Sequence, residues 1–337
     1  MKKALCTLLV LGFLSVLYEQ YQLGNAQDQS AAKDKSSHKV QFIEVEKGVA
    51  LEVLDWGGKG TALVLIPGGG LDAHEFDDFA PKLTLSHHVY GITRRGFGAS
   101  SAPTPDGANY SSDRLGDDIL AVVDALALNR PVLVGHSLGG VELSSVGSRF
   151  PQKVAGLIYL EAAYSYAYYS QPLGDPILDM LDLHGRLNEV MAKGLGSSQQ
   201  LEQLKGSTDQ LARSLQALQT QRSLMPPPPP RPADAPPPPP VGMAIALERT
   251  RYTALQVPIL AIFADPHDFG SLYQNNPSAR AAVVANDFAT TSAQADALQA
   301  GVPSAHIIRI PNADHDIFKS NEGQVIKEMN AFIDSLH

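Results

Sequence analysis

A serine in a glycine-rich turn is the feature of this chain that points most directly to chemistry. The run Gly135-His136-Ser137-Leu138-Gly139 follows the apolar residues Val132–Val134. Glycine two residues before and two residues after a serine allows a sharp turn from strand to helix, with the hydroxyl exposed at its tip. Residues 113–126, before the strand, and 141–146, after the turn, are apolar at helical spacing. We therefore predict that Ser137 is a nucleophile.

A serine hydroxyl becomes a strong nucleophile only when a neighbouring base takes its proton. Of the 10 histidines, His315 has the most suitable position, because it follows the predicted strand His306–Ile310 and precedes the predicted final helix Gly323–Leu336. A loop in that position can return to the serine turn. We therefore expect His315 to act as the general base.

A carboxylate is expected to orient the imidazole and stabilise its charged form. We favour Asp268, because a few loop residues usually separate the preceding strand from the acid, here Ile259–Phe263. Asp265 is the second alternative, and Glu161, at the end of the predicted strand Gly156–Leu160, is the third. In each case the chain order is serine, acid, histidine, which matches one known triad layout.

His267 lies between the two candidate aspartates and is expected to be a neighbour of the triad rather than its base.

Acyl transfer also needs hydrogen-bond donors for the charge that develops on the substrate oxygen. The N–H group of Leu138 is one expected donor. The second is expected from Gly69, because glycines after the apolar run Ala62–Ile66 let the backbone approach a substrate closely. Four further residues are expected to line the substrate site: Gly68, Gly70, His136 and Tyr164. The tyrosines at 164, 166, 168 and 169 either line an aromatic pocket or pack an insertion against the core.

Alternating strands and helices must position these residues. Eight short runs are predicted as strands: Val40–Glu46, Val49–Trp56, Ala62–Ile66, Val89–Thr93, Val132–Val134, Gly156–Leu160, Ile259–Phe263 and His306–Ile310. Helical patterns lie between most of them, which predicts an α/β fold with a mostly parallel sheet covered on both faces.

Residues 166–248 interrupt the alternation. Helices are predicted over Pro176–Leu187 and Ser198–Arg222. Two blocks of five prolines lie within residues 226–240, which predicts an extended polyproline II segment. Such a segment acts either as a stiff surface spacer or as a docking site for a partner with an aromatic groove.

The first residues have the pattern of an export signal. Lys2 and Lys3 precede an apolar stretch of about 14 residues, which is too short to span a bilayer comfortably. Small residues allow cleavage after Ala26, with a retained membrane anchor as the alternative. We therefore expect a signal peptide over residues 1–26, a disordered linker over 27–38, and a periplasmic or secreted protein without a membrane span in its mature chain.

Composition excludes several classes of protein. The net charge of −9 argues against nucleic-acid binding. The single cysteine, Cys6, lies in the signal segment, so no disulfide is expected in the mature chain. No closely spaced cluster of histidine and cysteine occurs, so we expect neither a metal nor an organic cofactor.

With these pieces placed, the chain resembles the α/β-hydrolase family over about residues 39–165 and 249–337. The resemblance depends on four stretches taken together: Pro67–Gly70, Gly91–Ser100, Gly135–Gly140 and the His315 loop. It implies a hydrolase core in two parts with residues 166–248 as a lid over the active site. It also implies the roles already given to Ser137, His315, Gly69 and Leu138.

The chain departs from the family pattern at three positions. Pro67 stands where many members have histidine, Thr93 where many have aspartate, and Ala264 where glycine usually precedes the acid loop. Dehalogenases and most epoxide hydrolases of this fold use an aspartate nucleophile, so Ser137 disfavours both activities.

The leading hypothesis is a carboxylesterase-like serine hydrolase that cleaves an ester or similar acyl bond of a small molecule through an acyl-enzyme intermediate. Cofactor-free perhydrolysis and the cleavage of amide or carbon–carbon bonds are the enzymatic alternatives. A ligand-binding module that keeps the hydrolase fold without catalysis is the alternative from another class.

Overall fold

The computed structural model describes residues 37–194, 196–226 and 239–336. The expected signal peptide, most of the expected linker over 27–38 and most of the proline-rich segment lie outside the described residues. None of the described helices has the length and apolar character needed to cross a membrane.

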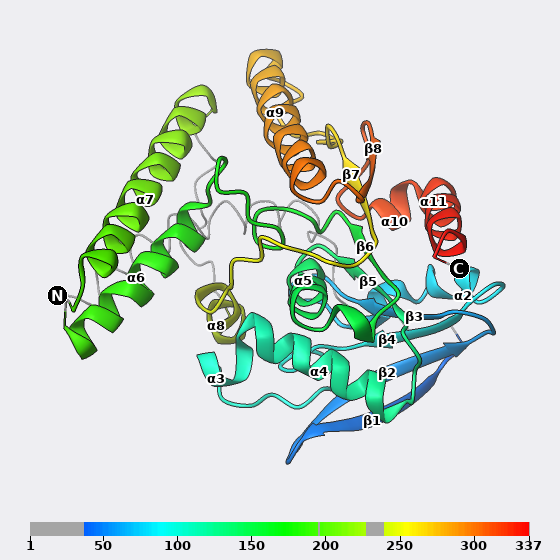
Figure 1. The fold of residues 1–337 in the computed structure, drawn as a ribbon. Coiled ribbons are helices and arrows are strands. Elements are labelled where there is room, and N and C mark those ends of the chain that lie inside the picture. The colour runs from blue at the N-terminus through cyan, green and yellow to red at the C-terminus, as the bar shows by residue number, and fades with distance from the viewer. Residues whose placement is uncertain (1–36, 195, 227–238, 337) are drawn as a thin grey trace. The chain divides into compact units, whose positions relative to one another are not determined.

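A mixed sheet of eight strands forms the centre of the fold (Figure 1). The strand order is β1-β2-β4-β3-β5-β6-β7-β8. Strands β1 and β2 pair antiparallel, β2 pairs antiparallel with β4, and every pairing from β4 to β8 is parallel. The strands span Lys39–Glu46 (β1), Val49–Gly57 (β2), Ala62–Ile66 (β3), His88–Ile92 (β4), Val132–His136 (β5), Gly156–Leu160 (β6), Ile259–Ala264 (β7) and His306–Ile310 (β8). The expectation of a mostly parallel sheet is confirmed.

Helices cover both faces of this sheet, because neighbouring side chains of a strand point to opposite faces. In β5, Leu133 packs into the cluster beneath α4, α5 and α9, whereas Val132 and Val134 pack into the cluster on the other face. The first group of helices spans Ser112–Ala125 (α4), Gly139–Arg149 (α5) and Pro277–Gly301 (α9). The second group spans Ala73–Phe76 (η1), Ala80–Leu83 (α2), Ile317–Ser320 (α10) and Glu322–Asp334 (α11).

Three helices lie in the insertion between β6 and β7: α6 (Pro176–Lys193), α7 (Ser198–Leu224) and α8 (Pro240–Leu247). Helices α6 and α7 pack against each other (Figure 1). Both begin where predicted and extend beyond their predicted ends. Helix α8 packs in a small apolar cluster that also contains Leu138, which brings the insertion next to the serine turn. The role of the insertion as a lid stays a prediction.

The predicted site residues follow the carboxyl ends of the parallel strands, which meet at one edge of the sheet. The loop of glycines follows β3, Ser137 follows β5 and Glu161 follows β6. Asp265 follows β7, and the loop that carries His315 follows β8. The fold therefore gathers residues from five separate segments at this edge.

Candidate active site

Ser137 occupies a sharp turn between β5 and α5. Its φ angle is +48°, in the left-handed region that residues other than glycine seldom adopt. The backbone around it is held at both sides, since the Ser137 N–H donates to the carbonyl of Leu160 at 3.2 Å and the Gly140 N–H donates to the carbonyl of Ser137 at 3.0 Å. A strained turn that is fixed in this way is typical of a functional site.

His315 contacts the carboxylate of Glu161. Its Nδ1 lies 3.3 Å from Oε2 of Glu161, which leaves Nε2 as the ring nitrogen that can exchange a proton. The Glu161 side chain is fully buried, and its backbone also has a left-handed φ of +51°. The Tyr164 hydroxyl donates to Oε2 at 2.8 Å, and the Ala264 N–H donates to Oε1. Glu161, the third alternative from the sequence, is thus the acid in contact with His315.

A second imidazole shares the same carboxylate. His267 places Nε2 2.5 Å from Oε2 of Glu161, and its Nδ1 lies 3.0 Å from Asp287. Burial alone would lower the pKa of His267, but Glu161 and Asp287 raise it to about 10. Burial alone would raise the pKa of Glu161, but His267 and His315 lower it to about 2. Glu161 is therefore ionised and His267 positively charged at neutral pH.

Asp268 and Asp265 lie apart from the His315 ring. Asp268 is exposed and accepts a hydrogen bond from the Gly270 N–H at 2.9 Å. Asp265 is buried and pairs with Ser292 at 2.7 Å and with Arg309 at 3.3 Å. Among the described residues, neither aspartate forms a hydrogen bond or ion pair with His315. The expected contact between Asp268 and His315 is therefore absent from the described structure.

The reason lies in the loop after β7. His267 forms a parallel β-bridge with Ala313, and the Asp268 N–H donates to the carbonyl of Ala313 at 2.8 Å. Adjacent side chains of an extended segment point in opposite directions. His267 therefore points towards Glu161, and Asp268 points towards solvent.

The glycine loop after β3 is fixed by buried charges. The guanidinium of Arg94 forms two hydrogen bonds with Glu142, at 2.6 and 2.7 Å, and donates to the carbonyls of Pro67 and Gly68 at 2.8 and 3.2 Å. Both charged side chains are nearly fully buried. Sequence reasoning did not identify this pair, although Arg94 lies in one of the stretches that carry the family resemblance.

The two expected oxyanion donors lie at neighbouring positions. A Cβ atom on Gly69 would lie 3.2 Å from Cδ2 of Leu138, so the glycine loop approaches the serine turn closely. In the described part of the chain, the N–H groups of Gly69 and Leu138 donate no hydrogen bond to the protein. Both donors therefore remain available to a substrate oxygen. Gly70 has a left-handed φ of +79°, which its lack of a side chain allows.

We expected His136 to line the substrate site, but its side chain is buried. Its Nε2 donates to the carbonyl of His315 at 3.2 Å, and its Nδ1 lies 3.3 Å from Glu75. Glu75 in turn accepts a hydrogen bond from the Gly68 N–H at 2.8 Å. Burial alone would lower the pKa of His136, but Glu75 and Asp316 raise it. This ring therefore connects the glycine loop, the serine turn and the His315 loop.

The four tyrosines after β6 have separate positions. Tyr164 bonds Glu161, as described above. Burial raises the pKa of Tyr166, and the neighbouring Ser137 side chain acts in the opposite direction. Tyr168 and Tyr169 are buried, and the Tyr169 hydroxyl donates to Asp179 at 2.6 Å. Tyr166 is therefore the member of this group whose pKa the expected nucleophile influences.

Two groups of three side chains in the described residues could hold a metal ion: Glu161, His267 and His315, and separately His38, His74 and Asp77. In the first group, the hydrogen bonds to Glu161 already account for the arrangement. The second group is linked by the contact of His74 with Asp77 at 2.9 Å.

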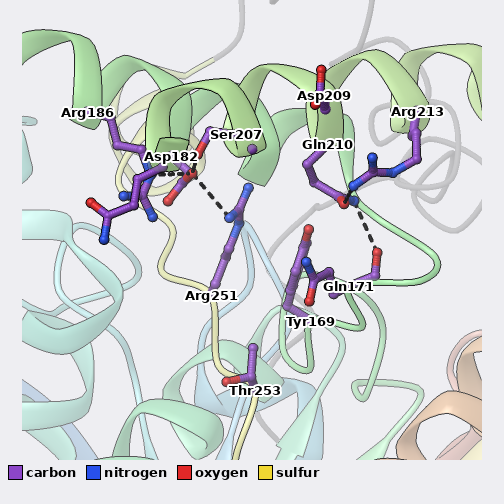
Figure 2. A pocket seen from close by; sticks show the side chains of 12 residues that line it. Tyr169, Gln171, Asp182, Arg186, Ser207, Asp209, Gln210, Arg213, Arg251 and Thr253 are labelled. Atoms are coloured by element: carbon purple, nitrogen blue, oxygen red, sulfur yellow. Dashed lines mark hydrogen bonds and ion pairs between the residues drawn. The ribbon is translucent and has the colours of Figure 1, made fainter. Parts of the chain in front are cut away.

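A cavity of about 430 Å³ lies between the inserted helices α6 and α7 and the segment that leads to β7 (Figure 2). Its walls include Tyr169, Asp182, Ser207, Gln210, Arg213 and Arg251, but neither Ser137 nor His315. Arg251 lies over the Tyr169 ring and pairs with Asp179 at 2.6 Å and with Asp182 at 3.4 Å. The charge of this arginine is therefore balanced within the protein.

Comparison with known proteins agrees with the fold. The model of the Alpha/beta hydrolase family matches residues 63–328, and the chain therefore belongs to this family. The curated proteins that resemble this chain include several hydrolases.

Curated relatives are similar over part of the chain. A fluoroacetate dehalogenase from a Burkholderia species is 32% identical over 117 residues, which cover 34% of this chain and 38% of that protein. An N-formylmaleamate deformylase from Pseudomonas putida is 38% identical over 92 residues, which cover 27% of this chain and 34% of that protein. The matched part thus spans little more than a third of either relative.

Solved structures resemble nearly the whole fold at low sequence identity. A hydrolase from Pseudomonas aeruginosa has a TM-score of 0.54 at 20% identity and covers 88% of this chain and 98% of that chain. A bromoperoxidase from Bacillus anthracis has a TM-score of 0.55 at 18% identity, and the match covers 88% of this chain and 100% of that chain. At this identity the likeness concerns the fold alone.

Proposed function

We propose that this protein is a serine hydrolase that cleaves an ester or similar acyl bond of a small molecule through Ser137, His315 and Glu161. The observation that carries the proposal is the contact between His315 and the buried, ionised Glu161, beside a serine held in a left-handed turn. Glu161 replaces Asp268 as the proposed acid of the triad.

In the proposed first step, Oγ of Ser137 attacks the substrate carbonyl while Nε2 of His315 takes the hydroxyl proton. Glu161, hydrogen-bonded to Nδ1, stabilises the imidazolium that forms. The N–H groups of Gly69 and Leu138 bind the negative charge on the carbonyl oxygen.

The leaving alcohol then takes the proton from Nε2 and departs, which leaves the acyl group on Ser137. A water molecule gives its proton to the same nitrogen and attacks the acyl-enzyme carbonyl. Collapse of this second intermediate returns the proton to Oγ and releases the acid. Each step uses the same base and the same two oxyanion donors.

The choice of an ester over other acyl bonds is the finer part of the proposal. The names of the relatives include a dehalogenase and a deformylase, so the family resemblance alone does not select the bond. A serine at position 137 favours acyl transfer over dehalogenation, which in this fold uses an aspartate nucleophile. Rates on matched ester and amide substrates, with and without peroxide, separate esterase, amidase and perhydrolase activities.

A fluorophosphonate probe tests the proposed nucleophile directly. We expect covalent labelling of purified residues 27–337 at Ser137, mapped by mass spectrometry, and loss of labelling in His315→Ala. Ser137→Ala is the matched control for the site of attachment. Labelling at another residue, or undiminished labelling of His315→Ala, contradicts the proposal, and ligand binding without any turnover supports a non-catalytic module.

A further inference from the structure

Among the described residues, no carboxylate forms an ion pair with Arg249. It lies two residues after the end of α8, in the segment that leads to β7. Its Nε atom is buried without a hydrogen-bond partner, and among the described residues its guanidinium forms no hydrogen bond or ion pair. Burial lowers the pKa of Arg249 from its ordinary value, which is the direction expected for a cation without a close counter-charge.

The acid whose charge acts on Arg249 is already engaged. Asp175 exerts an attraction on Arg249 but does not form an ion pair with it. Its carboxylate accepts hydrogen bonds from the Ile177 N–H at 2.9 Å and the Leu178 N–H at 3.0 Å, which cap α6, and another from Ser165 at 2.5 Å. Arg251, two residues further on, shows the contrast, because two carboxylates balance its charge.

Arg249 contacts a tyrosine whose pKa the proposed nucleophile influences. Its guanidinium carbon lies over the ring of Tyr166, 5.6 Å from the ring centroid. Burial raises the pKa of Tyr166, and the neighbouring Ser137 side chain acts in the opposite direction, so the two hydroxyls lie close together. The cation therefore contacts a tyrosine that lies near the proposed nucleophile.

We propose that Arg249 binds an anionic group of the substrate, so that this hydrolase acts on acyl compounds that carry a carboxylate or a similar anion near the scissile bond. This inference rests on the proposed function. The guanidinium presents five N–H donors in a planar fork that matches a carboxylate in a two-point contact. A partly buried cation without a partner is costly, and a bound anion removes that cost.

A matched pair of substrates tests the inference. One is the mono(4-nitrophenyl) ester of adipic acid, with a free carboxylate, and the other is 4-nitrophenyl methyl adipate, which has the same acyl chain without the charge. We expect the wild-type protein to favour the charged ester by at least about tenfold in kcat/KM, which corresponds to about 1.4 kcal/mol. Rates are corrected for hydrolysis without enzyme.

Substitution of Arg249 should remove this preference selectively. In Arg249→Gln we expect KM for the charged ester to rise until the two esters have similar kcat/KM, while the rate on the neutral ester is kept. Arg249→Lys should retain part of the preference, because it keeps the charge without the fork. Arg213→Gln removes an exposed arginine of α7 and should leave the preference unchanged, which controls for the net charge of the protein.

Fluorophosphonate labelling separates the possible failures. If Ser137 is labelled and both esters are cleaved, but wild type and Arg249→Gln show the same preference, the inference about Arg249 is overturned and the proposed function stands. If Ser137 is not labelled and neither ester is cleaved, the proposed function fails and this inference falls with it.

Discussion

Single residues decide the chemistry of this site through the hydrogen bonds of one carboxylate. Glu161 accepts from His315, His267, Tyr164 and the Ala264 backbone. The charge on His267 keeps Glu161 ionised, while His315 remains free to exchange a proton at Nε2. Asp287 contacts the other ring nitrogen of His267 and so fixes the orientation of that ring. The proposed acid is therefore positioned by a second histidine that does not itself face the nucleophile.

Exchange of the two competing acids distinguishes their roles. We expect Glu161→Gln to lower kcat/KM by about 10³- to 10⁴-fold, because the amide no longer stabilises the imidazolium. Asp268→Asn should leave kcat/KM unchanged, because that side chain is exposed and bonds only its own loop. Ester kinetics of both variants, with thermal unfolding as the control for folding, decide the matter. A large loss confined to Asp268→Asn would return the assignment to that residue.

At the scale of elements, close packing of α5 against two strands shapes the serine turn. A Cβ atom on Gly139 would lie 2.7 Å from the carbonyl oxygen of Ile66, at the end of β3. A Cβ atom on Gly140 would lie 2.0 Å from the carbonyl oxygen of Ala162, just after β6. These glycines let the helix begin directly beneath the turn, and the left-handed φ of Ser137 is a consequence of that geometry.

Gly140→Ala should therefore destabilise the fold. We expect a loss of about 3 kcal/mol or more in the free energy of unfolding, because a backbone carbonyl cannot move aside as a side chain can. Gly185→Ala on α6 is the matched control, since nothing lies within 4 Å of the position that its methyl group would take. That variant should gain up to about 1 kcal/mol from helix propensity. Urea denaturation measures both, and equal effects would contradict the packing argument.

At the scale of the whole molecule, strand order decides which loops meet. Strand β6 lies between β5 and β7, so the end of β6 is flanked by the serine turn and by the loop that carries His267. Because the carboxyl ends of all parallel strands share one edge, residues 137, 161, 267 and 315 converge there despite their separation in sequence. The charges buried at this edge couple the stability of the fold to pH.

The pH dependence of stability follows from two opposite pKa shifts. Glu161, lowered from 4.5 to about 2, contributes stability above pH 4.5 that is lost as the pH falls towards 2. His267, raised from 6.5 to about 10, contributes stability below pH 6.5 that is lost as the pH rises towards 10. Both contributions are complete between pH 4.5 and 6.5.

We expect His267→Gln to unfold at a lower temperature than wild type at pH 6, since the variant leaves a buried carboxylate with one partner fewer. The difference in Tm should shrink steadily as the pH rises towards 10, because wild type then loses the charge on His267. Thermal unfolding of both proteins from pH 5 to pH 10 is the measurement. Two parallel curves would show that His267 is neutral in the folded protein.

The sequence by itself determined the features that depend on local constraints. The predicted strands Ala62–Ile66, Gly156–Leu160 and His306–Ile310 agree with the structure residue by residue. For the first two, the reason is that buried parallel strands leave continuous apolar runs. The glycines around Ser137 predicted a sharp turn, because only a residue without a side chain fits there. Helix α9 was harder to predict, since its many alanines and threonines form no continuous apolar stripe.

Only the tertiary structure decided which acid contacts His315. Three carboxylates follow neighbouring strands, and sequence spacing favoured Asp268 among them. The pairing of His267 with Ala313 points Asp268 outwards, and the position of β6 in the sheet brings Glu161 to the imidazole. That Arg249 forms no ion pair with another described residue was likewise not apparent in the sequence, because it depends on how the nearby side chains pack.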